Sequence, residues 1–339
     1  MPKRPVTVRD VAARAQVDPS TVSRVLAGKP ARSETRQRVL QAAAELGYSP
    51  NAIARSLRLR HAFSVGVLVP DITNPFFAEV IDGAQAEAEQ HGYFLLLMNT
   101  REDMETAQAY LRVLEESRVD GLMLATALTQ DRLIEELRRK QVPFVLVNRR
   151  TEEEGDHYVI VDGQKGAYMA VEHLVRLGHR RIAHISGPLY TNTALDRLQG
   201  YRLALREFGL DFAEEYVAEA HFQQASGRRA MERLLQLRPR PTAVFCANDL
   251  IALGALSACH EAGLHVPGDV SLVGFNDIEL ASQISPPLTT VAAWPRRMGA
   301  EAARMLIERI EGGSPSRHHL VLEPRLVVRG STGPVPVEA

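Results

Sequence analysis

The stretch VTVRDVAARAQVDPSTVSRVLAG at residues 6–28, followed by SETRQRVLQAAAELGYSPNAIARSLR at residues 33–58, predicts a compact helical unit at the start of the chain. Asp18 is a natural N-cap, and Pro19 suits the first turn of a helix, where no backbone N–H is needed. Gly28 is a typical stop signal after the last turn. These signals predict a short helix over residues 19–27.

We expect one further helix on each side of this one. Thr7 and Asp10 have the spacing of a capping box at the start of the first, which ends near Gln16. The third begins at Ser33 and ends at Gly47. Apolar residues at helical spacing predict a small shared core made of Val8, Val11, Ala12, Ala15, Val22, Val25, Leu26, Val39, Leu40, Ala43 and Leu46.

The outer face of the middle helix carries Ser20, Thr21, Ser23 and Arg24. Short hydroxyls can reach phosphates, and a guanidinium can pair with guanine in the major groove of DNA. Residues 1–60 hold twelve Lys and Arg against four Asp and Glu, a balance of +8, and the rest of the chain has a balance of −9. On charge alone, a solvated helical face explains the basic head as well as DNA does. Charge and side chains together predict a DNA-binding head.

A short helix is expected next, over Pro50–Arg58. So short a helix does not hold in water by itself, and its apolar residues have no partner within the segment. It therefore needs a partner to fold. Leu57 is the type of apolar wedge that enters a minor-groove step and kinks a duplex. A plain amphipathic linker helix is the alternative.

At this point the head resembles the LacI/GalR family of transcriptional regulators. The resemblance rests on T-V-x-D-V-A at Thr7–Ala12, T-V-S-R-V-L at Thr21–Leu26 and L-G-Y-x-P-N-A-x-A at Leu46–Ala54. Asp18 replaces the usual Ser, which keeps the cap but places a carboxylate near phosphate. Ala27 replaces a common Asn, so one polar DNA contact is expected to be absent. The resemblance implies that Pro19, Ser20 and Arg24 read bases, that Thr7, Thr21, Ser23, Tyr48 and Asn51 contact the DNA backbone, and that Ala54 and Leu57 belong to the hinge helix, with Leu57 intercalating.

The body alternates short apolar runs with helical patterns, which predicts βαβ units and buried parallel sheets. The scheme occurs twice, so two doubly wound α/β subdomains are expected, and the resemblance gives them a periplasmic-binding-protein-like fold. Expected strands are 63–69, 94–98, 121–125, 144–147, 158–161, 181–186, 216–220, 243–246, 271–275 and 288–292. Expected helices are 75–91, 105–118, 131–141, 166–177, 194–208, 227–237, 249–262 and 298–311.

The resemblance also implies that the chain crosses between the two subdomains near Trp294 and returns once more near its end. The tail after Arg329 is rich in turn residues, so no helical tetramerisation arm is expected. The expected domains are the headpiece at 1–48, hinge helix and linker at 49–61, the N-terminal subdomain at 62–162 and 293–321, the C-terminal subdomain at 163–292 and 322–330, and a flexible tail at 331–339.

Polar and aromatic residues follow the apolar runs of the body. Ligands of open α/β sheets bind beyond the carboxyl ends of the strands, where these residues would meet. Aromatic faces with planar amide and guanidinium groups suit a sugar. For any single residue a turn or helix cap is the better explanation, but several at one edge favour a ligand site. The candidates are Asp71, Asn74, Phe76, Phe77, Asn148, Arg149, Arg197, Asn248 and Asn276.

A resemblance to periplasmic sugar-binding proteins implies the same pocket. Asn148 and Asn276 stand where many relatives carry Asp, and Ala293 replaces a frequent Gln. A neutral polyol and an acidic sugar bound by Arg149 and Arg197 both stay open, as does a purine or nucleoside.

An enzyme is the alternative from a different class. The chain contains no H-E-x-x-H, G-x-S-x-G, G-x-x-x-x-G-K-[ST] or G-x-G-x-x-G motif, so we expect neither catalysis nor a cofactor. His173, His179 and His184 are expected to be structural or exposed. Cys246 and Cys259 are expected to be core thiols in a reducing cytoplasm, and no apolar run predicts a membrane span.

The expected mechanism is a homodimer that reads a pseudo-palindromic operator in double-stranded DNA. Each head places its second helix in the major groove, and the paired hinge helices fold on the central minor groove. An effector bound between the two subdomains would reorient them and change how closely the hinge helices sit. Induction and co-repression use the same machinery, so the direction of control stays open.

Overall fold

A computed structural model describes residues 6–26, 30–48, 61–101, 119–128, 131–151, 153, 155–313 and 318–336. The chain divides into two units, residues 1–62 and 63–339, called here the headpiece and the core. The predicted helix over 105–118 and the predicted hinge helix, with Asn51, Ala54 and Leu57, lie outside the described residues.

Three helices form the headpiece, as predicted: α1 (Val8–Ala15), α2 (Pro19–Leu26) and α3 (Ser33–Leu46). The backbone N–H and the hydroxyl of Thr7 both donate to the Asp10 carboxylate, at 2.7 Å each, which caps α1. Leu40 was expected in the core and is 47% exposed. Ala42 takes its place, because the inward positions of α3 are Val39, Ala42 and Ala43 and the next residue after Val39 turns about 100° away. The buried residues are Val11, Ala12, Ala15, Val22, Val25, Val39, Ala42 and Ala43.

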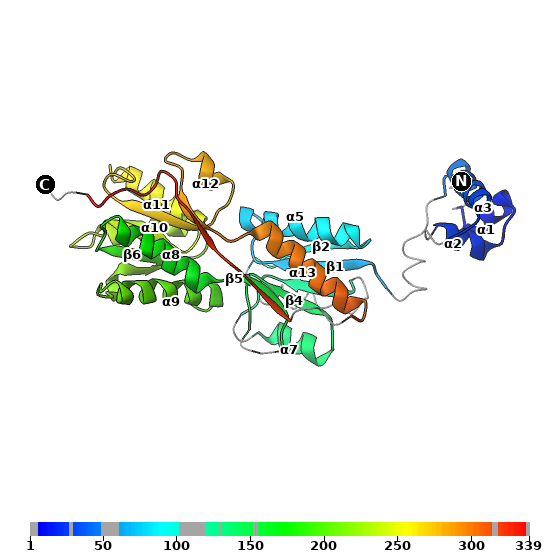
Figure 1. Cartoon of the computed structure of the whole chain (residues 1–339), viewed down its shortest axis with the longest axis horizontal. Helices are drawn as coiled ribbons and strands as arrows, with labels where there is room; N and C mark the ends of the chain where they lie inside the picture. The colour runs from blue at the N-terminus through cyan, green and yellow to red at the C-terminus, as the bar shows by residue number, and fades with distance from the viewer. Residues whose placement is uncertain are drawn as a thin grey trace. The chain divides into compact units, whose positions relative to one another are not determined.

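The first sheet of the core has six strands in the order β11-β5-β4-β3-β1-β2. All neighbouring strands are parallel, as the unbroken apolar runs predicted. Figure 1 shows α5 and α13 side by side over this sheet. The elements are β1 (Ser64–Val69), β2 (Phe94–Asn99), β3 (Gly121–Leu124), β4 (Phe144–Val147), β5 (Tyr158–Val161), β11 (His319–Leu322), α5 (Pro75–Gln90), α7 (Arg132–Arg139) and α13 (Pro295–Ile310).

The second sheet also has six strands, in the order β12-β10-β9-β8-β6-β7. Only β12 runs antiparallel to its neighbour, β10. The strands are β6 (Ile182–Ser186), β7 (Val217–Glu219), β8 (Ala243–Cys246), β9 (Ser271–Asn276), β10 (Thr289–Ala292) and β12 (Arg325–Val327). The helices are α8 (Gly163–Arg176), α9 (Asn192–Glu207), α10 (Gln224–Leu235), α11 (Asp249–Glu261), α12 (Leu280–Gln283) and the 3₁₀ turn η1 (Glu214–Tyr216).

Helix pairs in the core approach closely at glycines. A Cβ atom on Gly299 of α13 would lie 1.9 Å from the carbonyl oxygen of Val80 on α5. A Cβ atom on Gly200 of α9 would lie 2.1 Å from the carbonyl oxygen of Gln164 on α8. Only glycine permits these backbone contacts, so the two positions set how near the helices pack.

The chain crosses between the two sheets three times: after β5, between β10 and α13, and between β11 and β12. Trp294 has a left-handed backbone with φ of 56°, and its indole N–H donates to the carbonyl oxygen of Glu323 at 2.8 Å. This bond ties the second crossing to the third. The predicted crossing near Trp294 is present, and β11 extends to Leu322, one residue beyond the boundary expected for the first subdomain.

The expectation of a flexible tail from residue 331 is wrong for its described part. Ser331 is 1% exposed, and its hydroxyl accepts from the Thr289 N–H and donates to the Leu272 carbonyl, at 2.8 and 2.7 Å. The Val335 N–H donates to the Leu177 carbonyl at 3.0 Å. The turn residues of this segment predicted disorder. The segment instead forms hydrogen bonds with backbone groups at the end of the second sheet.

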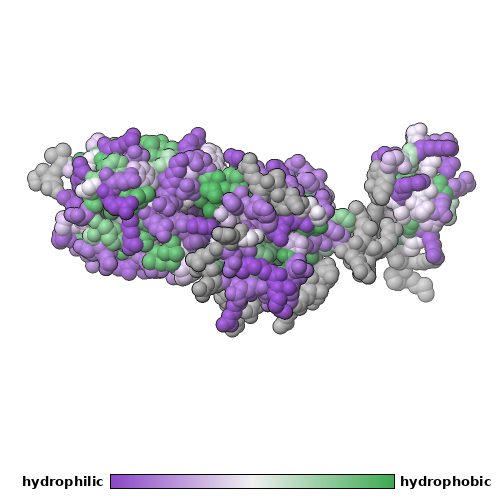
Figure 2. Space-filling view, turned by 60° about the horizontal axis from the view of Figure 1, so that its bottom comes forward, coloured by the Kyte–Doolittle hydropathy of each residue, from purple (hydrophilic) through white to green (hydrophobic). Residues whose placement is uncertain are grey.

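The surface of the core in Figure 2 is largely hydrophilic and is interrupted by small hydrophobic areas. Within the described part of the chain, the helices are all too short or too polar to cross a membrane. Cys246 and Cys259 are free and buried, and burial raises the pKa of each thiol, that of Cys259 to about 12. These thiols are therefore inert core groups.

Candidate functional site

A cavity of about 460 Å³ lies at the carboxyl ends of strands from both sheets. All nine residues predicted as a ligand site line it, although they come from segments spread over more than two hundred positions. These residues were expected to lie close together because they follow the carboxyl ends of parallel strands, and they do line one cavity. The lining residues are Pro70, Asp71, Ile72, Thr73, Asn74, Phe76, Phe77, Asn99, Arg101, Asn148, Arg149, Thr193, Arg197, His221, Phe222, Gln223, Asn248 and Asn276.

Two asparagines enter the cavity from strained backbone positions. Asn148 follows β4 with φ of 63°, and Asn276 ends β9 with φ of 117°. Residues other than glycine seldom adopt such angles, and those that do cluster at functional sites. The Oδ1 atom of each is buried and has no hydrogen-bond partner among the residues that the structure describes. Both amides are thus available to a ligand.

Arg197 on α9 is 3% exposed and lines the cavity. Its Nη1 donates to the Ala247 carbonyl at 2.6 Å, and its guanidinium lies 3.9 Å from the centre of the Phe275 ring. Its Nε has no hydrogen-bond partner in the described parts of the chain. Burial lowers the pKa of Arg197 to about 10, which still leaves it charged at neutral pH.

Arg149 enters from the first subdomain, on the loop between β4 and β5. It is 4% exposed, and its Nη1 donates to the Thr126 carbonyl at 3.1 Å. Arg150, the next residue, binds Asp196 of α9 with both Nη atoms. The loop thus directs one guanidinium into the cavity and the next onto the second subdomain.

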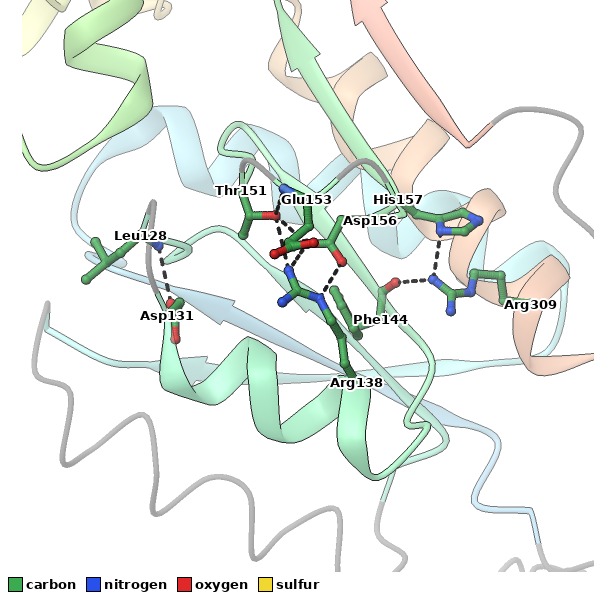
Figure 3. A network of polar contacts seen from close by, with 9 residues as sticks. All are labelled: Leu128, Asp131, Arg138, Phe144, Thr151, Glu153, Asp156, His157 and Arg309. Atoms are coloured by element: carbon green, nitrogen blue, oxygen red, sulfur yellow. Dashed lines mark hydrogen bonds and ion pairs between the residues drawn. The ribbon is translucent and has the colours of Figure 1, made fainter.

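The polar network of Figure 3 holds this loop in place. Arg138 of α7 binds both carboxylate oxygens of Asp156, at 2.9 and 2.5 Å, and its Nη2 donates to the Thr151 hydroxyl at 3.3 Å. The hydrogen bond to Asp156 raises the pKa of Arg138. The Thr151 hydroxyl also donates to Asp156. Hydrogen bonds therefore join Thr151, which directly follows Arg150, and Asp156 to Arg138 of α7. The guanidinium positions therefore depend on side chains outside the cavity.

On the other side of the same loop, Arg309 of α13 donates to the Phe144 carbonyl at 2.8 Å and lies 3.0 Å from the Nδ1 atom of His157 (Figure 3). Burial, together with the charge of Arg309, lowers the pKa of His157 to about 4. The ring of His318 packs edge-on against His157, with their centres 4.9 Å apart. His157 is therefore neutral and structural.

Helix caps supply part of the lining. The Asn74 Oδ1 accepts from the Phe76 N–H at 3.1 Å, and the Asn248 Oδ1 accepts from the Ile251 N–H at 2.8 Å. The cap explanation for these two residues is thus correct, and both also line the cavity. The Asp71 Oδ1 accepts from the N–H and hydroxyl of Thr73, at 2.9 and 2.7 Å, and Asp71 is a half-exposed turn residue. Asn74 and Asn248 therefore both cap a helix and line the cavity.

The lining includes residues that the sequence interpretation did not select. Asn99 is the last residue of β2 and Arg101 follows it, and His221, Phe222 and Gln223 follow β7. Each group comes directly after a predicted strand, so the rule that found the others could have found them as well. Thr193 in the first turn of α9 gave no such signal.

Two buried titratable groups lie behind the lining. Asp249 accepts from the Thr290 hydroxyl at 2.5 Å and from the Ile278 N–H at 2.9 Å, and burial raises its pKa to about 7. His184 lies between the rings of Tyr201 and Phe245, and its Nδ1 is 2.9 Å from the Phe245 carbonyl. Burial lowers the pKa of His184 to about 4, so it is neutral. The predicted structural role of this histidine fits its packing.

In the headpiece, α2 presents Pro19, Ser20 and Arg24 to solvent, while Thr21 and Ser23 are half-buried. Asp18 Oδ1 accepts from the Ser20 N–H at 2.8 Å, and hydrogen bonds from Ser20 lower the pKa of Asp18. The Thr7 hydroxyl serves the α1 cap, and Tyr48 packs half-buried against the headpiece core. The exposed face of α2 is therefore polar and includes the exposed Arg24 guanidinium, a group that can pair with guanine in the major groove.

The described residues contain no group of three or more His, Cys, Asp or Glu side chains placed to hold a metal ion. His173 contacts Thr332, and His179 contacts Thr242 and Ser271. Both histidines therefore serve the packing of the second sheet, away from the cavity.

The chain is similar to known proteins over nearly its whole length. A family model described as "Bacterial regulatory proteins, lacI family" matches residues 7–51, and one described as "Periplasmic binding protein-like domain" matches residues 171–332. The "HTH-type transcriptional repressor PurR" of Aliivibrio salmonicida (strain LFI1238) is 36% identical over 96% of this chain and 98% of its own length. The protein of the same name from Proteus mirabilis (strain HI4320) is 38% identical over 97% and 98%.

Solved structures give the same result. A "transcriptional regulator CelR-cellobiose complex" is 36% identical, with a TM-score of 0.76, over 97% of this chain and all of its own. The "lac repressor dimer bound to operator and the anti-inducer ONPF" is 31% identical, with a TM-score of 0.86, over the same shares.

Proposed function

Because the chain belongs to the LacI family of bacterial regulators, and is thus a DNA-binding transcriptional repressor controlled by a small effector, we propose that its effector is a sugar or sugar derivative bound in the cavity between the two sheets. The observation that carries the proposal is the convergence of nine polar and aromatic residues from distant segments on this cavity. Its volume falls within the range of small-molecule sites, about 300–1,000 Å³.

The chemistry of the lining suits a polyol. Phe76, Phe77 and Phe222 supply aromatic surface for the C–H faces of a ring, and the amides of Asn148 and Asn276 can donate to and accept from hydroxyls. The similar CelR structure contains a disaccharide, cellobiose. A purine base is the second candidate, because the same aromatic surface would also stack on a planar ring and the PurR relatives align over nearly their full length.

The headpiece is proposed to read operator DNA with Pro19, Ser20 and Arg24 of α2 and to contact the DNA backbone through Thr7, Thr21, Ser23 and Tyr48. Asn51 is also proposed to contact the DNA backbone, and Ala54 and Leu57 of the hinge helix are proposed to contact the DNA, with Leu57 as the intercalating residue. The working form is proposed to be a homodimer on a pseudo-palindrome, acting in the cytoplasm; the lac repressor neighbour was solved as a dimer on its operator. No catalytic step is proposed.

Effector binding is proposed to change the angle between the two subdomains. The cavity draws its lining from both, so a ligand that contacts both sides favours one relative orientation. A coupling of about 1–3 kcal/mol changes operator affinity about 5–150-fold.

A two-part experiment tests this function. The operator is first selected from a random duplex pool, and a panel of sugars, sugar acids, sugar phosphates and purine bases is screened by thermal shift. Each compound that raises Tm is then titrated into the complex of protein and operator. A binder from the panel that changes operator affinity supports the proposal, and Arg197→Ala should abolish that response while operator binding persists. A variant that responds normally would exclude this cavity as the effector site.

A further inference from the structure

We propose that the effector carries an anionic group, a carboxylate or a phosphate, beside its hydroxyls. The inference rests on the proposed function and deepens it by naming the charge of the ligand. Its basis is the charge of the cavity lining, which among the described residues includes Arg101, Arg149 and Arg197 and a single carboxylate, that of Asp71. Asp71 is half-exposed and already accepts two hydrogen bonds from Thr73.

Arg197 forms no direct ion pair with a carboxylate of the described residues, although the charges of Asp196 and Asp249 partly offset the effect of burial on its pKa. Asp196, its neighbour on α9, is bound by both Nη atoms of Arg150 at 2.5 and 2.9 Å. Asp249 is engaged by the Thr290 hydroxyl and the Ile278 N–H. Arg197 itself has a carbonyl and an aromatic ring as partners, and it forms no ion pair within the described residues. A buried cation in this state gains more from an anion than from a neutral hydroxyl.

The two asparagines of the cavity add no negative charge to its lining. Asn148 and Asn276 are neutral amides that line the same cavity as Arg197. Their unpartnered Oδ1 atoms accept hydrogen bonds and so call for hydroxyl donors on the same ligand. The lining therefore suits a ligand that has both hydroxyl donors and a negatively charged group.

Helix ends add to the positive potential. The helices α5, α9 and α11 begin at the cavity, where Asn74, Thr193 and Asn248 belong to or adjoin their first turns. The N-terminus of a helix carries a partial positive charge that favours anions. The dipoles and the buried guanidinium thus act in the same direction.

The first test uses inorganic phosphate, which needs no knowledge of the sugar. Thermal shift of the full-length protein is measured in sodium phosphate and in sodium chloride at matched ionic strength. The variants are Asn148→Asp and Asn276→Asp, each of which adds a carboxylate to the cavity. Gln236→Glu makes the same change of charge at an exposed position at the far end of α10 and is the matched control. We expect phosphate to raise Tm for the wild type and for Q236E, and the gain to be lost in N148D and N276D.

The second test uses matched sugars. Glucose, galactose and mannose are compared with their uronates and 6-phosphates by calorimetric titration. In the series that binds, the acidic form should bind at least about tenfold tighter than its neutral parent, because it forms charge-assisted hydrogen bonds. N276D should reverse that preference. Comparison of the uronate with the phosphate identifies which anionic group is preferred.

Two outcomes would overturn the inference. The first is an equal phosphate response of the wild type, N148D and N276D. The second is a neutral sugar that binds as tightly as its acidic forms; this result would leave the proposed sugar effector standing. A purine base as the sole binder would refute both the charge and the sugar.

Discussion

The guanidinium of Arg150 and the carboxylate of Asp196 join the two subdomains, with Nη1 to Oδ2 at 2.5 Å and Nη2 to Oδ1 at 2.9 Å. The hydrogen bond to Asp196 raises the pKa of Arg150. Each partner stands next in sequence to a cavity arginine, Arg149 on one side and Arg197 on the other. The ion pair therefore fixes the two backbones from which the cavity guanidinium groups project.

Breaking this ion pair should weaken effector binding without removing any lining side chain. Arg150→Ala and Asp196→Ala should each raise the effector Kd, and the double variant should show a coupling of about 0.5–3 kcal/mol, because contacting residues are not additive. Calorimetric titration of the four proteins gives the cycle. The exposed pair Arg176 and Glu172 on α8 is the control and should show no coupling in effector affinity. Additive effects of R150A and D196A would mean that the bridge does not shape the cavity.

Arg24 should decide sequence preference in the headpiece. Arg24→Ala is expected to cost about 1–3 kcal/mol of operator affinity and to relax preference at one base pair per half-site, since a guanidinium reads guanine bidentately. Arg14 is the control, because it is bound to Glu45 at 2.5 Å across α1 and α3. Binding is measured on the operator and on single-base variants of it. A uniform loss over all sequences would identify Arg24 as a phosphate contact.

The buried carboxyl of Asp249 should make stability depend on pH. Its pKa is raised from 3.8 to about 7, so the protonated form stabilises the fold fully below pH 3.8, and this contribution is lost as pH rises through 7. Asp249→Asn removes the titration, at a constant cost for one altered hydrogen bond. Between pH 5 and 8 the variant should gain about 2–3 kcal/mol relative to the wild type. Denaturant unfolding at several pH values measures this, and parallel profiles would contradict it.

The C-terminal segment should contribute to the stability of the second subdomain. Ser331→Ala leaves the Thr289 N–H and the Leu272 carbonyl without the hydroxyl that each contacts, so a loss of about 1–3 kcal/mol is expected. Deletion of residues 331–339 should cost more, because the Leu272 N–H also loses the Ser331 carbonyl. Chemical denaturation of the three proteins is the measurement. A deletion variant as stable as the full chain would show that the segment only rests on the sheet.

Sequence patterns predicted the buried strands best. The bounds of β4, β5 and β8 agree with the prediction to the residue, because each is an unbroken apolar run between turn residues. The bounds of the edge strands β11 and β12 were not predicted, since both strands are short and half-exposed. Leu40 was misplaced because a single apolar residue beside a true inward position looks the same in sequence.

The candidate site was predictable for a different reason. Parallel strands share one carboxyl edge, so polar residues after separate strands had to meet, and Asn148 and Asn276 do. The sequence pattern could not predict which side chains pair across the fold. Asp196 is bound by Arg150 and Asp249 by Thr290, and these partners lie 46 and 41 positions away in the sequence. These contacts leave Arg197 without an ion pair among the described residues.

The three crossings between the sheets have a consequence for synthesis. The first sheet lacks β11 and the covering helix α13 until about residue 322 has been made, and the second lacks β12 and the Ser331 contacts until later still. Neither half can complete its hydrogen bonding while the chain is growing, although the headpiece is contiguous and can fold early. A nascent repressor can therefore complete its headpiece well before it completes the core that holds the cavity.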